Sequence, residues 1–79
     1  MHVKLFATYR RDAGCDALDI EAGTAGEVRE ALAERFGERF RAPGAILLVD
    51  GVNVQLLQGD DTPISADARV ELFPPLGGG

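Results

Sequence analysis

Residues 68–79, ARVELFPPLGGG, begin as a strand and end as a glycine tail. Val70 and Leu72 alternate with charged residues, which is the period of a strand that buries one face. The two prolines that follow Phe73 end this strand, because proline has no backbone N–H to donate and a fixed φ. The pattern predicts a strand that delivers the last residues of the chain away from the body.

Working back along the chain, two strands are predicted at the N-terminus. Residues 2–8 place Val3, Leu5 and Ala7 on one face, again at the period of a half-buried strand. A polar stretch follows as a long turn, and residues 18–20 alternate once more. We therefore expect an N-terminal hairpin with its apolar face on the core.

One amphipathic helix is predicted between Thr24 and Gly37. Thr24 and Glu27 have the spacing of a capping box, and Gly37 suits a C-terminal cap. Four apolar side chains at i, i+3, i+4 and i+8 form one stripe: Val28, Ala31, Leu32 and Phe36. The helix should lie across a sheet with this stripe inward.

A second hairpin is predicted before the final strand. Residues 45–49 are apolar, Asp50-Gly51 is a strong signal for a two-residue turn, and residues 52–57 should pair back as a shorter strand. The order of elements before the final strand is therefore ββαββ, and the fold is α+β. We expect the last strand in the centre of a mixed sheet beside the first, and one main helix across one face.

Seventy-nine residues support a single domain. We predict a body over residues 1–73 and a flexible tail over residues 74–79. The six residues after Phe73, if extended, reach about 20 Å, far enough to enter the active site of another protein.

Composition and charge exclude several classes of function. A formal net charge of −5 argues against nucleic acid, because phosphate backbones need clustered Lys and Arg. The longest apolar run, residues 45–49, is too short to cross a bilayer, so no membrane partner is expected. Cys15 and His2 stand alone, so neither a metal site nor a bound cofactor is predicted, and the cytoplasm is the expected compartment.

The C-terminal carboxylate on Gly79 is the most promising reactive group. Glycine lacks a Cβ, so a narrow channel can close around the main chain of the tail. A carboxylate is ionised at neutral pH and is a poor electrophile until ATP converts it to an acyl-adenylate. The alternative is a frayed terminus of no consequence, which is common in proteins.

Two stretches resemble the MoaD/ThiS family of ubiquitin-like sulfur carriers: Phe6-Ala7-Thr8-Tyr9-Arg10 with Ala13-Gly14, and residues 73–79. The resemblance covers the whole chain and is closer to MoaD, the small subunit of molybdopterin synthase, than to ThiS. It implies the β-grasp, or ubiquitin-like, fold. Gly78 and Gly79 match the family's functional pair, whereas Gly77 stands where the family more often has a small residue with a side chain.

The resemblance also implies partners and chemistry. A ubiquitin-activating-type enzyme would use ATP to adenylate Gly79, a sulfur donor protein would convert it to a thiocarboxylate, and a larger molybdopterin-synthase-like subunit would receive the sulfur. The chain would not be catalytic alone. Two alternatives stay open: a protein modifier joined through Gly79 to target lysines, and a passive β-grasp interaction module.

Side-chain parity predicts a partner-binding face. Phe6 and Phe73 should both lie on the face away from the helix, joined there by Leu47 or Val49. Exposed apolar patches with aromatic centres often mark protein partners. Besides the two phenylalanines, the tail residues expected to contact partners are Pro74, Pro75, Leu76 and Gly77.

Overall fold

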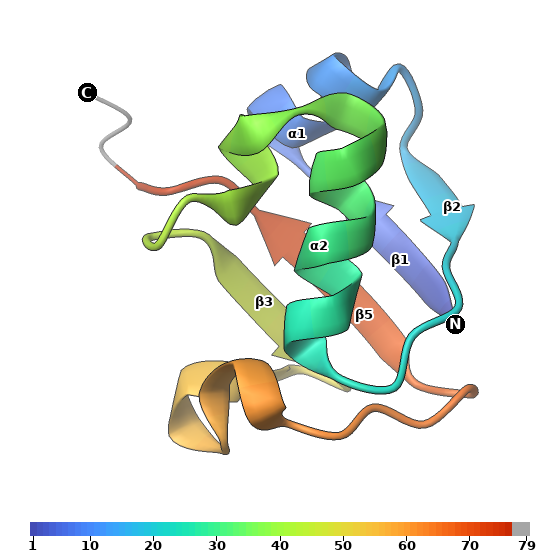
Figure 1. Ribbon diagram of the computed structural model, residues 1–79, viewed down its shortest axis with the longest axis vertical. Coiled ribbons are helices and arrows are strands. Elements are labelled where there is room, and N and C mark those ends of the chain that lie inside the picture. The colour runs from blue at the N-terminus through green and yellow to red at the C-terminus, as the bar shows by residue number, and fades with distance from the viewer. Residues whose placement is uncertain (77–79) are drawn as a thin grey trace.

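The computed structural model describes residues 1–76. Five strands form one mixed sheet in the order β2-β1-β5-β3-β4, and the long helix α2 covers one face (Figure 1). The strands are β1 (His2–Leu5), β2 (Ala17–Asp19), β3 (Ile46–Val49), β4 (Val52–Asn53) and β5 (Arg69–Phe73). The helices are α1 (Ala7–Ala13) and α2 (Ala25–Phe36), with 3-10 turns η1 (Glu38–Arg41), η2 (Val54–Leu56) and η3 (Gly59–Asp61).

The last strand, β5, occupies the centre of the sheet. It pairs in parallel with β1, where Val3 faces Val70 and Leu5 faces Leu72, and antiparallel with β3. A strand bonded on both sides is held more firmly than an edge strand, whose backbone groups lack partners. The predicted central position of this strand is confirmed, and so is the ββαββ order of the strands and main helix that precede it.

Helix α2 begins and ends where the sequence predicts. The Thr24 hydroxyl accepts from the Glu27 N–H at 3.2 Å, and the Glu27 carboxylate accepts from the Thr24 N–H at 3.2 Å, which completes the capping box. The Gly37 N–H closes the helix by donating to the Ala33 carbonyl. Val28 and Leu32 are fully buried against the sheet, so the predicted apolar stripe is confirmed.

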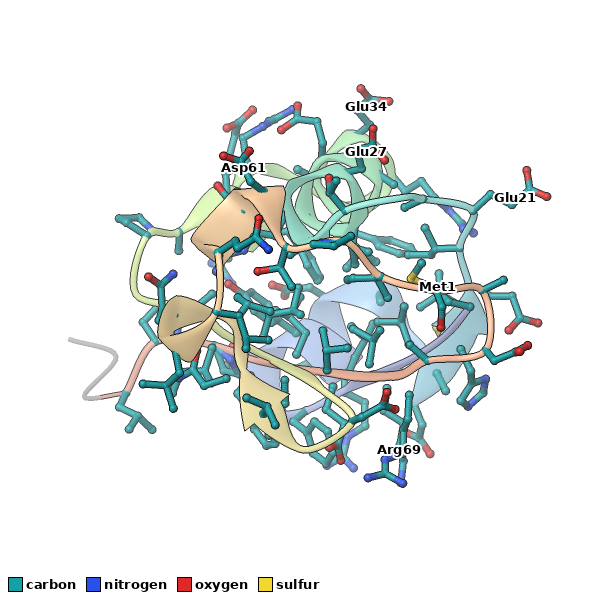
Figure 2. The ribbon with its side chains drawn as sticks, turned by 90° about the horizontal axis from the view of Figure 1, so that it is seen from below. Met1, Glu21, Glu27, Glu34, Asp61 and Arg69 are labelled. Atoms are coloured by element: carbon teal, nitrogen blue, oxygen red, sulfur yellow. The ribbon has the colours of Figure 1, made fainter. Side chains whose placement is uncertain are left out.

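The core lies between α2 and one face of the sheet, and each strand of the central pair contributes alternate residues. Figure 2, which views the molecule from below, shows this layering, with Glu27 and Glu34 on the helix layer and Arg69 beyond the sheet. The largest fully buried side chains are Val3, Leu5, Tyr9, Val28, Leu32, Phe40, Leu47, Val54, Val70 and Leu72. No helix within residues 1–76 is long and apolar enough to cross a membrane.

The N-terminal strand is shorter than predicted. It ends at Leu5, and Ala7–Ala13 forms α1 instead of a strand end and a long turn. Ala7 turns the chain with φ 53° and is exposed, so its predicted place on the core face is wrong. The physical reason is burial: helical spacing carries Tyr9 into the core, where it is only 1% exposed and stacks on Phe40.

The predicted turn of the second hairpin is confirmed, but the predicted length of its second strand is wrong. Asp50 and Gly51 have φ of 50° and 86°, the two positive values that a type I′ turn requires. Beyond Asn53, however, the predicted strand over residues 52–57 becomes the 3-10 turn η2. Val54, the first residue of this turn, is fully buried.

Candidate functional site

An aromatic pair marks the open face of the sheet. Phe6 and Phe73 stack with ring centroids 4.2 Å apart and planes 10° from parallel. The pairing of β1 with β5 sets this geometry, because the Phe6 N–H donates to the Leu72 carbonyl at 3.2 Å. Both rings are half-buried, so the prediction that they lie together on the face away from α2 is confirmed.

The third strand extends this apolar surface, but through different residues than predicted. Ile46 is the partner of Phe73, and Leu48 is the partner of Glu71, so these two side chains join the open face. Leu47 and Val49 pair with Leu72 and Val70 on the core face, and their predicted place beside the phenylalanines is wrong. A strand that is apolar at every position gives no parity signal, and only the register decides its faces.

The root of the tail lies against the body. Pro74 and Pro75 are half-buried, and a Cβ added to Gly44 would lie 3.1 Å from the Pro75 Cβ. Leu76, by contrast, is 84% exposed. The chain is therefore braced at Pro75 and reaches the surface one residue later.

A groove of about 600 Å³ runs beside this root. One wall is formed by the tail residues Pro74, Pro75 and Leu76, and the other by Thr8, Tyr9, Arg39 and Ala42. These second-wall residues come from α1 and from η1 and its C-terminal neighbour, two elements that sequence reasoning missed. The three-residue spacing of Phe6 and Tyr9, which suits a helix, was the signal in the sequence that could have revealed α1.

Tyr9 joins the two elements that form the second wall of the groove, α1 and η1. Its hydroxyl donates to the Arg39 carbonyl at 2.7 Å, across 30 residues of sequence. Burial raises the pKa of this phenol above its ordinary value, an effect that the Arg29 charge opposes and the Asp12 charge reinforces. The phenol therefore stays protonated and keeps donating at neutral pH.

The last three predicted site residues, Gly77, Gly78 and Gly79, lie outside the described residues, and their roles stay predictions. The boundary at residue 74 between body and tail also stays a prediction. Of the described residues, no group of three or more His, Cys, Asp or Glu side chains could hold a metal ion. Neither Cys15 nor His2 lies among the residues that line the groove.

The fold is shared with several solved proteins. Small archaeal modifier protein 1 from Methanosarcina acetivorans superposes with a TM-score of 0.82 at 23% identity, covering 99% of this chain and 94% of that one. CysO of Amycolatopsis orientalis, solved as a BexX/CysO complex, gives a TM-score of 0.81 at 14% identity, covering 99% and 98%. These likenesses establish the ubiquitin-like β-grasp fold.

A third structure is similar in sequence as well. A Pyrococcus furiosus protein provisionally assigned as molybdopterin converting factor subunit 1 has a TM-score of 0.77 at 25% identity, covering 95% of each chain. No curated protein sequence matches this chain. The model of the ThiS family matches residues 3–79, nearly the whole chain. With its β-grasp sheet and its glycine terminus, the chain therefore belongs to the ThiS family of ubiquitin-like sulfur carriers.

Proposed function

We propose that this chain is a cytoplasmic sulfur carrier that is loaded at Gly79. A partner enzyme of the ubiquitin-activating type joins the Gly79 carboxylate to AMP from ATP, with release of pyrophosphate. The terminal sulfur of a persulfide on a donor protein then attacks the acyl carbon, and AMP leaves. A thiol cleaves the S–S bond of the resulting acyl disulfide, so that the donor departs as a disulfide with that thiol and a thiocarboxylate remains on Gly79. The chain has no catalytic role of its own in these steps.

The observation that carries the proposal is the path of β5. This strand is hydrogen-bonded to β1 and β3 on its two sides, and it leaves the sheet beside the stacked Phe6 and Phe73. The chain is braced at Pro75 and emerges at Leu76, three residues before the C-terminal Gly79. The body thus brings the chain to the surface at Leu76 next to an apolar docking surface, as a carrier loaded in another protein's active site requires.

Molybdopterin synthesis is the pathway that we propose for the sulfur. The similarity to the Pyrococcus furiosus protein supports this choice, as do the Phe-Ala-x-x-Arg and Phe-Pro-Pro patterns around Phe6 and Phe73. A larger synthase-like subunit would hold the precursor and receive the tail. The stacked phenylalanines with Ile46 and Leu48 would dock on that subunit.

Intact-mass measurement after co-expression with the cognate adenylating enzyme and a sulfur source tests the proposal. We expect one oxygen of the chain to be replaced by sulfur, and the change to disappear when Gly79 is deleted. The loaded carrier should then convert the molybdopterin precursor in the presence of the larger subunit. Isopeptide conjugates of Gly79 to target lysines would instead identify a modifier, and a truncation without any effect would leave a passive module.

A further inference from the structure

A charged side chain that the proposed chemistry does not use lies inside the fold. Arg29 of α2 is only 8% exposed, and among residues 1–76 it is the only buried residue that carries a charge. Burial of a guanidinium group is costly unless hydrogen bonds replace those that it made with water. The groups around Arg29 therefore indicate what this side chain does.

One end of the guanidinium is bonded to the turn before β3. Its Nη2 donates to the Ala45 carbonyl at 3.2 Å, in a buried position. This turn, residues 42–45, is closed by the Ala45 N–H, which donates to the Ala42 carbonyl at 3.1 Å. In the part of the chain that the structure describes, Arg29 provides the only side-chain hydrogen bond to the turn. We call residues 42–45 the bracing turn.

The bracing turn meets the root of the tail at two places. Ala42 lines the groove opposite Pro74 and Pro75. A Cβ added to Gly44 would lie 3.1 Å from the Pro75 Cβ, so the backbone at Gly44 lies directly against the tail. Figure 1 shows this turn, between η1 and β3, beside the outgoing end of β5. Arg29 is thus connected to the root of the tail through one hydrogen bond and one close contact.

The other end of the guanidinium faces η3. Its Nε lies 3.5 Å from an Asp60 carboxylate oxygen, and within residues 1–76 this buried Nε has no hydrogen-bond partner. Gly26, one turn earlier on α2, lets η3 come close, because a Cβ there would lie 3.1 Å from the Asp60 Cβ. The Asp60 side chain is 65% exposed. The well-formed bond of Arg29 is therefore the one to the bracing turn.

Stability alone does not account for an arginine at this position. Apolar replacements of buried charges are often neutral or stabilising, because they avoid the cost of desolvation. Removal of Arg29 would leave no buried charge behind, since the Asp60 carboxylate is largely in water. An apolar side chain could fill the space, but it could not donate to the Ala45 carbonyl. The specific contribution of Arg29 is this directional bond.

We propose that Arg29 is a positioning residue for sulfur loading: its bond to Ala45 holds the bracing turn against Pro75 and so fixes the point at which the tail leaves the body. The inference rests on the proposed function. When the open face docks, the position of Leu76 decides whether the three residues after it, which span about 10 Å when extended, reach the reacting atoms. Placing residues 74–76 in advance also reduces the freedom that is lost when the tail is threaded.

The test compares two substitutions at adjacent positions of α2. Arg29→Met removes the charge and the donor and keeps a long unbranched side chain. Val28→Ala truncates a fully buried neighbour that makes no contact known to guide the tail, and it serves as the control for stability. Adenylation is measured as pyrophosphate release by the cognate enzyme over a range of carrier concentrations, at a temperature at which both variants are folded.

The kinetic constants should separate positioning from docking. We expect Arg29→Met to lower kcat by about tenfold, because the carboxylate is presented less accurately. Its KM should change little, because the open face still docks. Val28→Ala should keep the kcat of the wild-type chain although it unfolds at a lower temperature. Arg29→Met should unfold at nearly the temperature of the wild-type chain.

NMR gives a readout that does not depend on the enzyme. The amide signals of Gly44 and Leu76 should shift in Arg29→Met and stay in place in Val28→Ala. A wild-type kcat for Arg29→Met, or an unmoved Leu76 signal, would overturn the proposal. A marked loss of stability in Arg29→Met would overturn it too, because Arg29 would then serve the fold. A wild-type chain that is never adenylated would remove the proposed function, and the Leu76 signal would still decide whether Arg29 places the root of the tail.

Discussion

Adjacent residues of β5 should respond differently to the same truncation. Leu72 is fully buried in the core, whereas Phe73 is half-buried on the open face and stacks on Phe6. We expect Leu72→Ala to lower the free energy of unfolding by about 2–5 kcal/mol. Phe73→Ala should lose about 0.5–1.5 kcal/mol of aromatic pairing while weakening partner binding more strongly. Urea unfolding and binding titrations separate the two effects, and a larger stability loss for Phe73→Ala would contradict the face assignment.

Tyr9 should give the protein a pH-dependent stability at alkaline pH. Burial raises the pKa of its phenol, so the folded chain keeps a proton that the unfolded chain releases near pH ~10. The resulting stabilisation is complete below that pH and is lost as pH rises through the raised pKa. Tyr9→Phe removes the bond to the Arg39 carbonyl and should cost about 0.5–1.5 kcal/mol at neutral pH.

The same substitution should flatten the alkaline limb of the stability curve. Urea midpoints measured from neutral pH upward would show this as a smaller decline in the variant. Parallel curves for the two proteins would mean that Tyr9 ionises equally easily in the folded and unfolded chains.

At the scale of elements, the sequence was sufficient where contacts between near neighbours in the chain set the structure. The Thr24 capping box and the Asp50-Gly51 turn depend on neighbours within four residues, and both form as predicted. Helix α1 instead depends on distant partners, because Tyr9 stacks on Phe40 and bonds to Arg39. The alternation of apolar residues from Val3 onward indicated a longer strand, so this helix was not predicted.

The candidate site divides in the same way. Phe6 and Phe73 were placed by parity on two strands with clear alternation, whereas Ile46 and Leu48 required the register of an all-apolar strand. The groove was beyond prediction, since Thr8 and Ala42 meet only after α1 and η1 have packed beside Pro75. Contacts between residues that are far apart in the chain leave little trace in a single sequence.

The loop before β3 should control how the tail leaves the body. Gly44→Ala would place a Cβ 3.1 Å from the Pro75 Cβ, and Gly44 does not need a positive φ, so the strain falls on the contact with the tail. We expect slower sulfur loading with little change in thermal unfolding, and shifted NMR signals at Pro75 and Leu76. Normal loading with displaced signals would show that the angle of exit is unimportant.

In the whole molecule, the residues that stabilise the fold should be distinct from the residues that are needed for sulfur loading. The sheet, both helices and the core all lie within residues 1–76, so deletion of residues 77–79 should leave the thermal unfolding temperature unchanged and abolish sulfur loading. Deletion of residues 74–79 should additionally lower that temperature, because the contact between Pro75 and Gly44 is lost. Calorimetry and intact mass on the two truncations test this division. Destabilisation by the shorter deletion would mean that the glycine end contributes to the fold and is not solely a group for loading.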